Sequence, residues 1–303
     1  MKSKTRRLFP FLFSLYLSSA AKAFAAACCG GGFAAPALIV GDDKAQLTTS
    51  YAYSQVTDDV GTNSIWHKRD SRETSETIKI EGAHIFQDRW QAGLSVPVIR
   101  RTFLSQSSAG LGDVSGTLGY EYLPDWDYNP WRPRGSGFIQ LTLPTGKSIN
   151  ESDSVYQLDS RGRGFWAVGA GTILTKVIGR WDVFSSLDVH RSFNKNYSNS
   201  QSRGTLKPGY GGNFGLGGGY SVSSLRFGCG LTWSHEDPID VVGTATSNGS
   251  SQRLTTATLS ASYLFKQEFA VTLTYSDQTL FGNPSNTSLS QGATLFLQKR
   301  WLR

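Results

Sequence analysis

Beyond residue 27 the chain has no run of eighteen apolar residues, yet short segments of alternating polarity recur along almost its whole length. A chain crosses a bilayer either as apolar helices or as a closed β-barrel, because backbone polar groups in lipid must pair with one another. Barrel strands turn every second side chain toward lipid and the others toward the lumen. Alternation without long apolar runs therefore excludes membrane-spanning helices and is typical of a barrel wall.

The alternation is clear at both ends of the chain. In residues 46–54 leucine, threonine and tyrosine mostly alternate with glutamine, threonine and serine, and in residues 256–263 alanine, leucine and tyrosine alternate with threonine and serine. No helical period competes over comparable lengths. These segments predict an all-β fold, a single antiparallel up-and-down transmembrane barrel of about twelve strands, with ten to fourteen also fitting the pattern.

Turn residues place the boundaries of the twelve segments. The predicted strands are 45–55, 75–86, 90–104, 113–123, 136–145, 164–177, 181–194, 210–222, 225–235, 253–265, 269–279 and 288–302.

The connections between these strands alternate in length. Odd-numbered connections are mostly long and polar, as in 147–163, 195–209 and 236–252, and even-numbered ones are mostly tight, as in 179–180 and 223–224. Bacterial outer-membrane barrels have this asymmetry, with short periplasmic turns and long external loops. The exception is 124–134, a longer connection on the periplasmic side.

Aromatic side chains gather near the expected strand ends, as in the two interfacial girdles of a membrane protein. Near the periplasmic ends are Trp90, Tyr122, Trp181, Tyr220, Phe265, Phe269 and Trp301, and near the outer ends are Tyr53, Phe103, Trp166, Trp233 and Phe281.

The N-terminus has the three parts of a secretory signal: basic residues, an apolar run over 8–17, and small residues at 18–21. We expect residues 1–27 to be a signal peptide that exports the chain, either by simple cleavage or with lipidation of Cys28. Residues 28–44 are rich in glycine and alanine, and form either a periplasmic lead or a plug inside the barrel. Residues 45–303 are expected to form the barrel.

The net charge of +7 is misleading, because five basic residues lie in the first 27 positions. The remainder carries 25 basic and 23 acidic side chains, which gives no electrostatic reason to expect nucleic acid as a partner. The cysteines, Cys28, Cys29 and Cys229, form neither a disulfide framework nor a metal-ligand spacing. We expect no cofactor and no metal.

Several charged and polar side chains fall on the lumen side of the alternation. They can brace opposite walls of a narrow barrel or line a selective passage, and the sequence favours neither role. These lumen-lining candidates are Lys79, Glu81, Glu121, Gln140, Asp188, His190 and Arg226.

His190 and Ser192 offer an alternative, enzymatic interpretation. Outer-membrane phospholipase A and the lipid A deacylases place a histidine and a serine two residues apart on one strand face, where the imidazole activates the hydroxyl group toward a lipid ester. Those pairs face lipid, whereas the alternation here turns His190 toward the lumen. Pore lining is therefore the simpler reading, and a bulge near Ser192 would favour the enzyme.

The last predicted strand contains a polar residue, a glycine and then spaced apolar residues, which is similar to the signal read by the outer-membrane assembly machinery. Its residues are Gly292, Leu295, Leu297 and Trp301. It departs from the usual form because the chain continues to Arg303 instead of ending at phenylalanine.

Several short motifs together resemble one known family. They are Leu94–Pro97, Gly110–Val114, Leu118–Pro124, Leu141–Gly146 and Gly162–Trp166, in this order. In these residues the chain is similar to the outer-membrane proteins of the meta-pathway of phenol degradation, or transporter-like, family. The resemblance implies a barrel that passes small, often hydrophobic compounds, and it brings no catalytic residues.

The sequence thus predicts a Gram-negative outer-membrane channel or transporter that passes small molecules by passive diffusion, with hydrophobic or aromatic compounds among the candidates. The alternatives are a lipid hydrolase that uses His190 and Ser192, and a closed structural or surface-binding barrel. Expected partners are outer-membrane lipid and lipopolysaccharide, the barrel assembly machinery and a small solute. The solute, the oligomeric state and whether the pore is open do not follow from the sequence.

Overall fold

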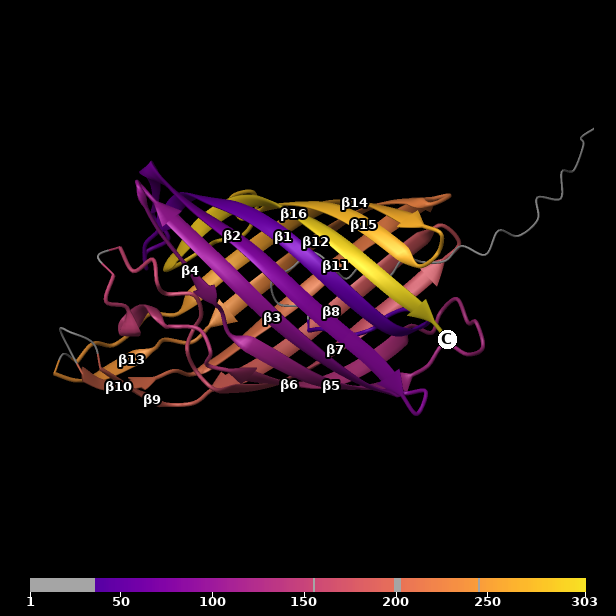
Figure 1. Cartoon of the computed structure of the whole chain (residues 1–303), viewed down its shortest axis with the longest axis horizontal. Helices are drawn as coiled ribbons and strands as arrows, with labels where there is room; N and C mark the ends of the chain where they lie inside the picture. Colours follow the sequence, from indigo (N-terminus) through magenta and orange to yellow (C-terminus); the bar gives the residue numbers. More distant parts are fainter. Residues whose placement is uncertain (1–35, 155, 199–202, 245) are drawn as a thin grey trace, which may run out of the picture.

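The structure, a computed structural model, describes residues 36–154, 156–198, 203–244 and 246–303. Its main body is a closed antiparallel barrel of twelve strands, so the predicted fold is confirmed (Figure 1). The barrel strands are β1 (Asp43–Val60), β2 (Trp66–Phe86), β3 (Trp90–Phe103), β5 (Val114–Leu123), β6 (Arg134–Leu143), β7 (Ala167–Ile178), β8 (Trp181–Ser192), β11 (Tyr210–Val222), β12 (Leu225–Glu236), β14 (Gln252–Phe265), β15 (Phe269–Asp277) and β16 (Thr287–Leu302). Each predicted strand overlaps one of them.

The first and last strands close the ring. β1 pairs with β2 along one edge and with β16 along the other. The register of β1 and β16 runs from Asp43 opposite Leu302 to Val60 opposite Thr287. Backbone amide and carbonyl groups are thereby paired around the circumference, as a wall in contact with lipid requires. Among the described residues, no helix is long and apolar enough to cross a membrane.

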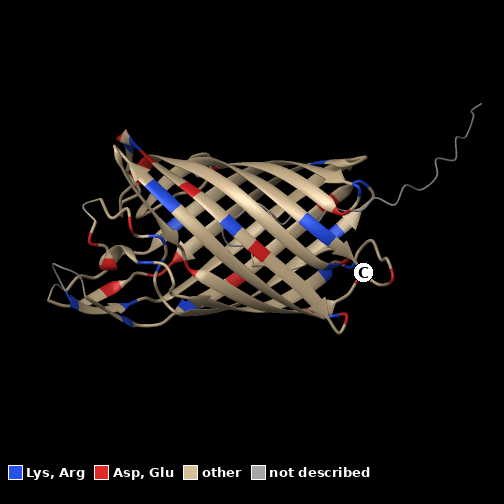
Figure 2. Cartoon of the chain, viewed as in Figure 1, with Lys and Arg blue, Asp and Glu red and all other residues tan. Residues whose placement is uncertain are grey.

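The two faces of the wall differ in the way the alternation predicts. On β15, Val271, Leu273 and Tyr275 point outward and are exposed, whereas Thr272 and Thr274 point inward and are buried. Strand pleating sends successive side chains to opposite faces, so a period of two gives one apolar face and one polar face. Charged side chains gather mainly at the two ends of the barrel and in the loops (Figure 2).

Outward-facing aromatic rings lie at the end of the barrel that carries the tight turns. Trp181 packs on Tyr220 with ring centroids 4.6 Å apart, and Trp90 packs on Tyr120 at 4.8 Å. Phe103 departs from the expected outer girdle. It faces inward, where its ring lies 5.1 Å from that of Tyr156 in the connection between β6 and β7, because the alternation of β3 places residue 103 on the lumen side.

The predicted long first connection is wrong. β1 and β2 continue as paired strands to Val60 and from Trp66, which leaves only residues 61–65 as the connection. The segment was read as a loop because its outward side chains, such as Lys68, Asp70 and Arg72, are also polar, and a bulge interrupts its register between Val56 and Asp58. A strand beyond the bilayer needs no apolar face.

Other loop segments also contain short strands. β4 (Gln106–Leu111) pairs with the outer half of β3, and β9 (Lys195–Ser198), β10 (Arg203–Lys207) and β13 (Asp240–Gly243) form a separate three-stranded sheet at the end with the long loops. This small sheet has its own core, in which Phe165, Tyr197 and Leu206 are buried. A one-turn 3-10 helix, η1 (Ile149–Glu151), lies between β6 and β7.

The proposed signal peptide, residues 1–27, and Cys28 lie outside the described residues. Of the glycine- and alanine-rich segment at 28–44, the structure describes 36–44, and the first residue of β1 is Asp43. Residues 36–40 lie inside the barrel, where Pro36, Ala37, Leu38 and Val40 line its cavity.

An arginine at the middle of the outward face should destabilise the barrel. Leu273 lies in the centre of the exposed run on β15, so Leu273→Arg places a charge in hydrocarbon and is expected to cost about 2–4 kcal/mol of unfolding free energy. Leu225→Arg, at the turn end of β12, should cost at most about 1 kcal/mol, because the charge reaches the interface. Urea unfolding in lipid vesicles measures both, and equal losses would contradict the orientation of the wall.

Candidate functional site

The interior of the barrel holds a cavity of about 650 Å³. Threonine, serine, glutamine and asparagine side chains provide much of its lining, with apolar groups from β6, β7 and residues 36–40. Of the lumen-lining residues predicted from the sequence, the structure places Lys79, Glu81, Gln140, Asp188 and His190 on this cavity. Lys79 and Glu81 form an ion pair with Nζ and Oε1 3.0 Å apart.

Glu121 and Arg226, the other two predicted residues, are buried in ion pairs of the barrel interior and are not part of the cavity lining. The Arg226 guanidinium donates to both Asp182 oxygens, with Nε 2.8 Å from Oδ1. Glu121 accepts from Arg134 on the neighbouring strand. Their charges are therefore used to join strands, which was one of the two roles that the sequence left open.

Residues 36–40 occupy the lumen at the end of the barrel with the tight turns, which we call the turn end. Two hydrogen bonds to the backbone of Ile39 hold the segment there. The Gln91 side chain accepts from the Ile39 amide at 2.7 Å and donates to the Ile39 carbonyl at 3.3 Å. Leu38 packs with Phe138 and Ile173, and Ile39 packs with Ala83 and Ile85.

Two glycines make room for this segment. A Cβ at Gly93 would overlap the Ala37 carbonyl oxygen, and a Cβ at Gly119 would lie 2.7 Å from Leu38 Cδ2. The barrel wall is thus shaped to receive the N-terminal segment, because any larger side chain at Gly93 would occupy its place.

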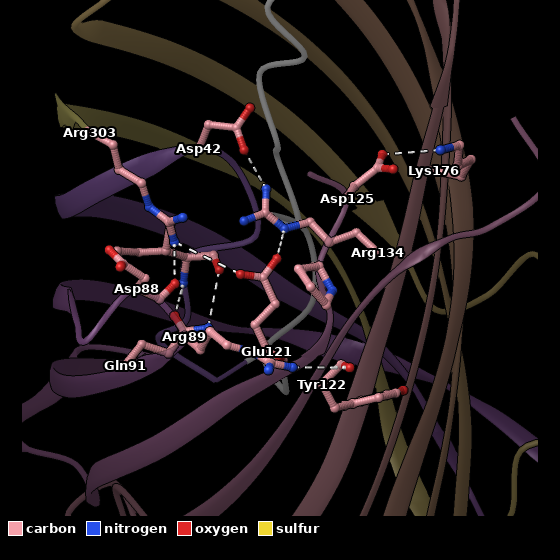
Figure 3. A network of polar contacts seen from close by, with 12 residues as sticks. Asp42, Asp88, Arg89, Gln91, Glu121, Tyr122, Asp125, Arg134, Lys176 and Arg303 are labelled. Carbon is pink, nitrogen blue, oxygen red and sulfur yellow. Dashed lines mark hydrogen bonds and ion pairs between the residues drawn. The ribbon is translucent and has the colours of Figure 1, made fainter. Parts of the chain in front are cut away.

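A network of charges fixes the chain just before β1 (Figure 3). Arg134 Nη1 lies 2.6 Å from Asp42 Oδ1, and the same guanidinium pairs with Glu121. Arg300 on the closing strand pairs with Asp43 at 2.8 Å, and both side chains are about 95 % buried. Removing one partner of such a buried pair leaves an uncompensated charge.

At the opposite end, the cavity is bounded by loop segments that cluster around Asp113 and hydrogen-bond to it. We call this hydrogen-bonded cluster the knot, without implying a knotted chain. This residue lies between β4 and β5, where the two strands together bulge against β3 and the Gly112 amide donates to the Pro97 carbonyl at 2.9 Å. Asp113 Oδ1 accepts from the Gly146 amide at 2.9 Å, and Oδ2 accepts from the amides of Arg163 and Gly164 at 2.7 and 3.1 Å.

Small residues allow this knot to form. A Cβ at Gly162 would lie 2.5 Å from Asp113 Oδ2, and Gly164 has a φ of +70°, which side chains other than glycine rarely adopt. Thr145 closes the other side, since its hydroxyl group donates to the Gly112 carbonyl at 2.6 Å and accepts from the Val114 amide at 3.0 Å. One carboxylate thereby joins the β4–β5 bulge to both ends of the connection between β6 and β7.

Arg163 extends from this knot to the far side of the lumen. Its guanidinium pairs with Glu236 on β12, and its Nη1 lies 3.2 Å from His190 Nε2 on β8. The imidazole also lies 3.3 Å from Glu236 Oε2, and Asp188 accepts from Asn213 at 3.0 Å. The bridge places a loop residue between two walls of the cavity.

The rest of the connection, which we call the mouth loop (residues 147–163), leans on the inner face of β3 and β4. Arg101 donates to the carbonyls of Gln157 and Ser160, and Arg161 Nη1 donates to Ser108 at 3.0 Å. Partial burial alone would raise the pKa of Asp159, but the Lys147 ammonium at 2.8 Å and the Ser152 hydroxyl outweigh it and lower that pKa to about 2.

His190 and Ser192 both line the cavity, and neither is on the outward face. Among the described residues, the partners of the imidazole are Arg163, Glu236 and Asp188, and Ser192 is buried. Within the same residues, no group of His, Cys, Asp and Glu side chains has the arrangement of a metal site. On β16, Leu295, Leu297 and Trp301 point outward, and Gly292 packs against the backbone of Tyr53. Their reading by the assembly machinery stays a prediction.

Asp113 and Arg163 lie within two of the motifs of the family resemblance, but the sequence did not predict a role for either residue. The signal available was the density of glycine around both, in Gly110–Gly112 and Gly162–Gly164. Glycine in such a number indicates close backbone approach, although it does not say to which group.

Replacement of Asp113 should release the mouth loop. In Asp113→Ala the three amides lose their acceptor, so trypsin should cleave after Arg161 and Arg163 at least about tenfold faster in the folded protein. Asp153→Ala is the matched control, because Asp153 pairs with Lys147 at the surface and such pairs contribute little. Equal cleavage of the two variants would show that the knot does not hold the loop.

No family model matches the chain. The fold is similar to that of an outer membrane channel from Pseudomonas putida F1, at 17 % identity and a TM-score of 0.71, over 89 % of this chain and 99 % of that one. Weaker likenesses are the NanC porin, at 10 % identity, 84 % and 98 % coverage and a TM-score of 0.46, and the deltaS2 mutant of the TodX monoaromatic hydrocarbon channel, at 8 % identity, 86 % and 91 % coverage and a TM-score of 0.49. The first likeness shows that the chain has the fold of an outer-membrane barrel.

Proposed function

We propose that the protein is an outer-membrane channel that passes small molecules through its lumen. The observation that carries the proposal is the cavity of about 650 Å³, lined by both polar and apolar side chains, inside a wall whose outward face is apolar. A barrel that served only as a membrane anchor would have no need for an internal cavity, since side chains can fill a ring of this size. The P. putida barrel with the similar fold is named as a channel, which agrees with this role.

Orientation follows from the connections. The end with the tight turns faces the periplasm and the end with the mouth loop faces outward, as in other barrels of this class. Residues 1–27 would export the chain, the last strand would direct its assembly, and lipid and lipopolysaccharide would surround the wall. The proposal assigns no cofactor, because diffusion through a lumen needs none.

The passage is narrow at both ends. At the periplasmic end the segment at 36–40 lies in the lumen, and at the outer end Arg163 reaches across to Glu236. A solute must therefore pass beside these groups or displace them. The segment is held by the Gln91 hydrogen bonds and by the packing of Leu38 and Ile39, and Arg163 is held by Glu236 and His190. Neither group pairs as a strand of the wall, so their displacement leaves the barrel wall intact.

A lipid hydrolase is the weaker candidate. His190 and Ser192 face the cavity, whereas acyl chains of the bilayer contact the outward wall. The imidazole is engaged with Arg163 and Glu236, which supports a role in the outer narrowing of the channel instead.

Conductance of the refolded protein in a planar bilayer tests the proposal. The wild type should give discrete current steps, and Gly93→Val should raise the step size severalfold, because the new side chain occupies the position of Ala37 and expels the N-terminal segment. Gly116→Val is the control, since a Cβ there contacts nothing within 4 Å.

The two outcomes are distinct. Current from both proteins, larger in Gly93→Val, supports a channel that residues 36–40 narrow. Silence from both, in protein that still shows heat-modifiable migration, would mean a closed barrel and would overturn the proposed function.

A further inference from the structure

We propose that the lumen selects neutral, polyhydroxylated solutes of sugar-like chemistry over both hydrocarbons and ions. The inference deepens the proposed channel function and rests on it. It starts from a set of lumen-facing side chains that we call the hydroxyl wall. The hydroxyl wall consists of Thr48 and Ser50 on β1, Thr77 on β2, Ser95 on β3, Thr274 on β15 and Thr294 on β16.

The strand register places these groups side by side. Ala52 on β1 lies opposite Thr77 on one side and Thr294 on the other, and Thr294 lies opposite Thr274. Three hydroxyl groups thus form a row across four neighbouring strands. Neighbouring strands are about 4.8 Å apart, so Thr274 and Thr294 lie one strand spacing apart and Thr77 lies two spacings from Thr294, beyond Ala52. The row therefore offers hydrogen-bonding groups at several points along a polyhydroxylated solute.

The hydroxyl wall lines the cavity with buried groups, one of which lacks a hydrogen-bond partner among the described residues. Thr274 is 97 % buried, and its Oγ1 has no hydrogen-bond partner among the described residues. Thr48, Ser50 and Thr77 are also buried within the lumen and line the cavity. An unpartnered hydroxyl group in such a place costs free energy until a solute or water supplies the missing bond.

Charged groups of the cavity are paired with each other. Lys79 pairs with Glu81 at 3.0 Å, and Arg163 pairs with Glu236. Asp113 accepts from the backbone amides of Gly146, Arg163 and Gly164. An ionic solute would have to displace one of these partners to gain a counter-charge. A neutral solute leaves them intact, so the electrostatics of the cavity favour a neutral one.

An apolar cluster lies across the cavity, on β6 and β7. Phe138, Ile173 and Leu38 form one cluster there, and Phe165 also lines the cavity. A sugar-like ring presents hydroxyl groups at its rim and C–H groups on its faces, so it can use the hydroxyl wall and this apolar cluster at once. A hydrocarbon would bury the hydroxyl wall without replacing the lost hydrogen bonds of water, which is costly.

Isosteric removal of the hydroxyl groups tests the inference. Liposome swelling reports entry of arabinose, a neutral pentose, and of gluconate, an anion, while bilayer conductance in KCl reports the open width. In Thr48→Val/Thr77→Val/Thr274→Val, arabinose entry should fall about tenfold, while conductance changes less than about twofold, because valine has the shape of threonine without its hydroxyl group. Wild-type protein should admit arabinose faster than gluconate.

Two variants keep the result interpretable. Thr49→Val makes the same change on the outward face of β1 and should alter neither measurement. Thr274→Val alone removes a hydroxyl group that has no hydrogen-bond partner in the described part of the chain, so the variant should fold as the wild type does and slow arabinose entry severalfold.

Failure of the inference differs from failure of the channel function. Unchanged arabinose entry in the triple variant, or wild-type current that aqueous toluene blocks while arabinose is excluded, would overturn the selection of polyhydroxylated solutes and leave a channel. The absence of both current and swelling in folded wild-type protein would overturn the channel itself.

Discussion

Pairing of every backbone amide and carbonyl group around a closed ring is the constraint on which the rest of the structure depends. In lipid an unpaired group of this kind costs several kcal/mol, so β1 must find β16 although about 240 residues separate them in the chain. Once the ring is closed, each strand has a lipid side and a lumen side, and the pleat alternates between them. Twelve strands leave an interior wide enough for a cavity, which polar side chains then line.

Ring closure also fixes the N-terminal segment. Arg300, on the closing strand, pairs with Asp43 at the first residue of β1, and Arg134 pairs with Asp42 one residue earlier. The chain therefore enters β1 from a point held at the end with the tight turns, and residues 36–40 before it lie within the lumen. The buried ion pairs there fix the position at which the chain enters β1. Apolar replacements would preserve the packing but would no longer hold the chain at this position.

The sequence predicted the wall well and the lumen contents poorly, for a physical reason. Alternation reports contact with lipid, so β15 and β16 are found almost to the residue, whereas the outer part of β2 is missed because both of its faces meet water. Their place in the alternation was sufficient to identify Lys79 and His190 as lumen-facing residues. It said nothing about partners, so the burial of Glu121 against Arg134 and the bridge from Arg163 to Glu236 required the three-dimensional register.

Four of the five motifs behind the family resemblance meet at Asp113, and the fifth, Leu118–Pro124, continues β5 to the turn end. Leu94–Pro97 supplies the carbonyl that accepts from Gly112, Leu141–Gly146 supplies Thr145 and the Gly146 amide, and Gly162–Trp166 supplies the amides of Arg163 and Gly164. Each of these residues is needed because a bulged strand, a carboxylate and two loop ends share a small space. Most of the hydroxyl wall lies on other strands, and only Ser95 shares β3 with this knot. These four motifs therefore describe how the outer mouth is built, and solute chemistry can differ between barrels that share them, because most of the hydroxyl wall lies on β1, β2, β15 and β16.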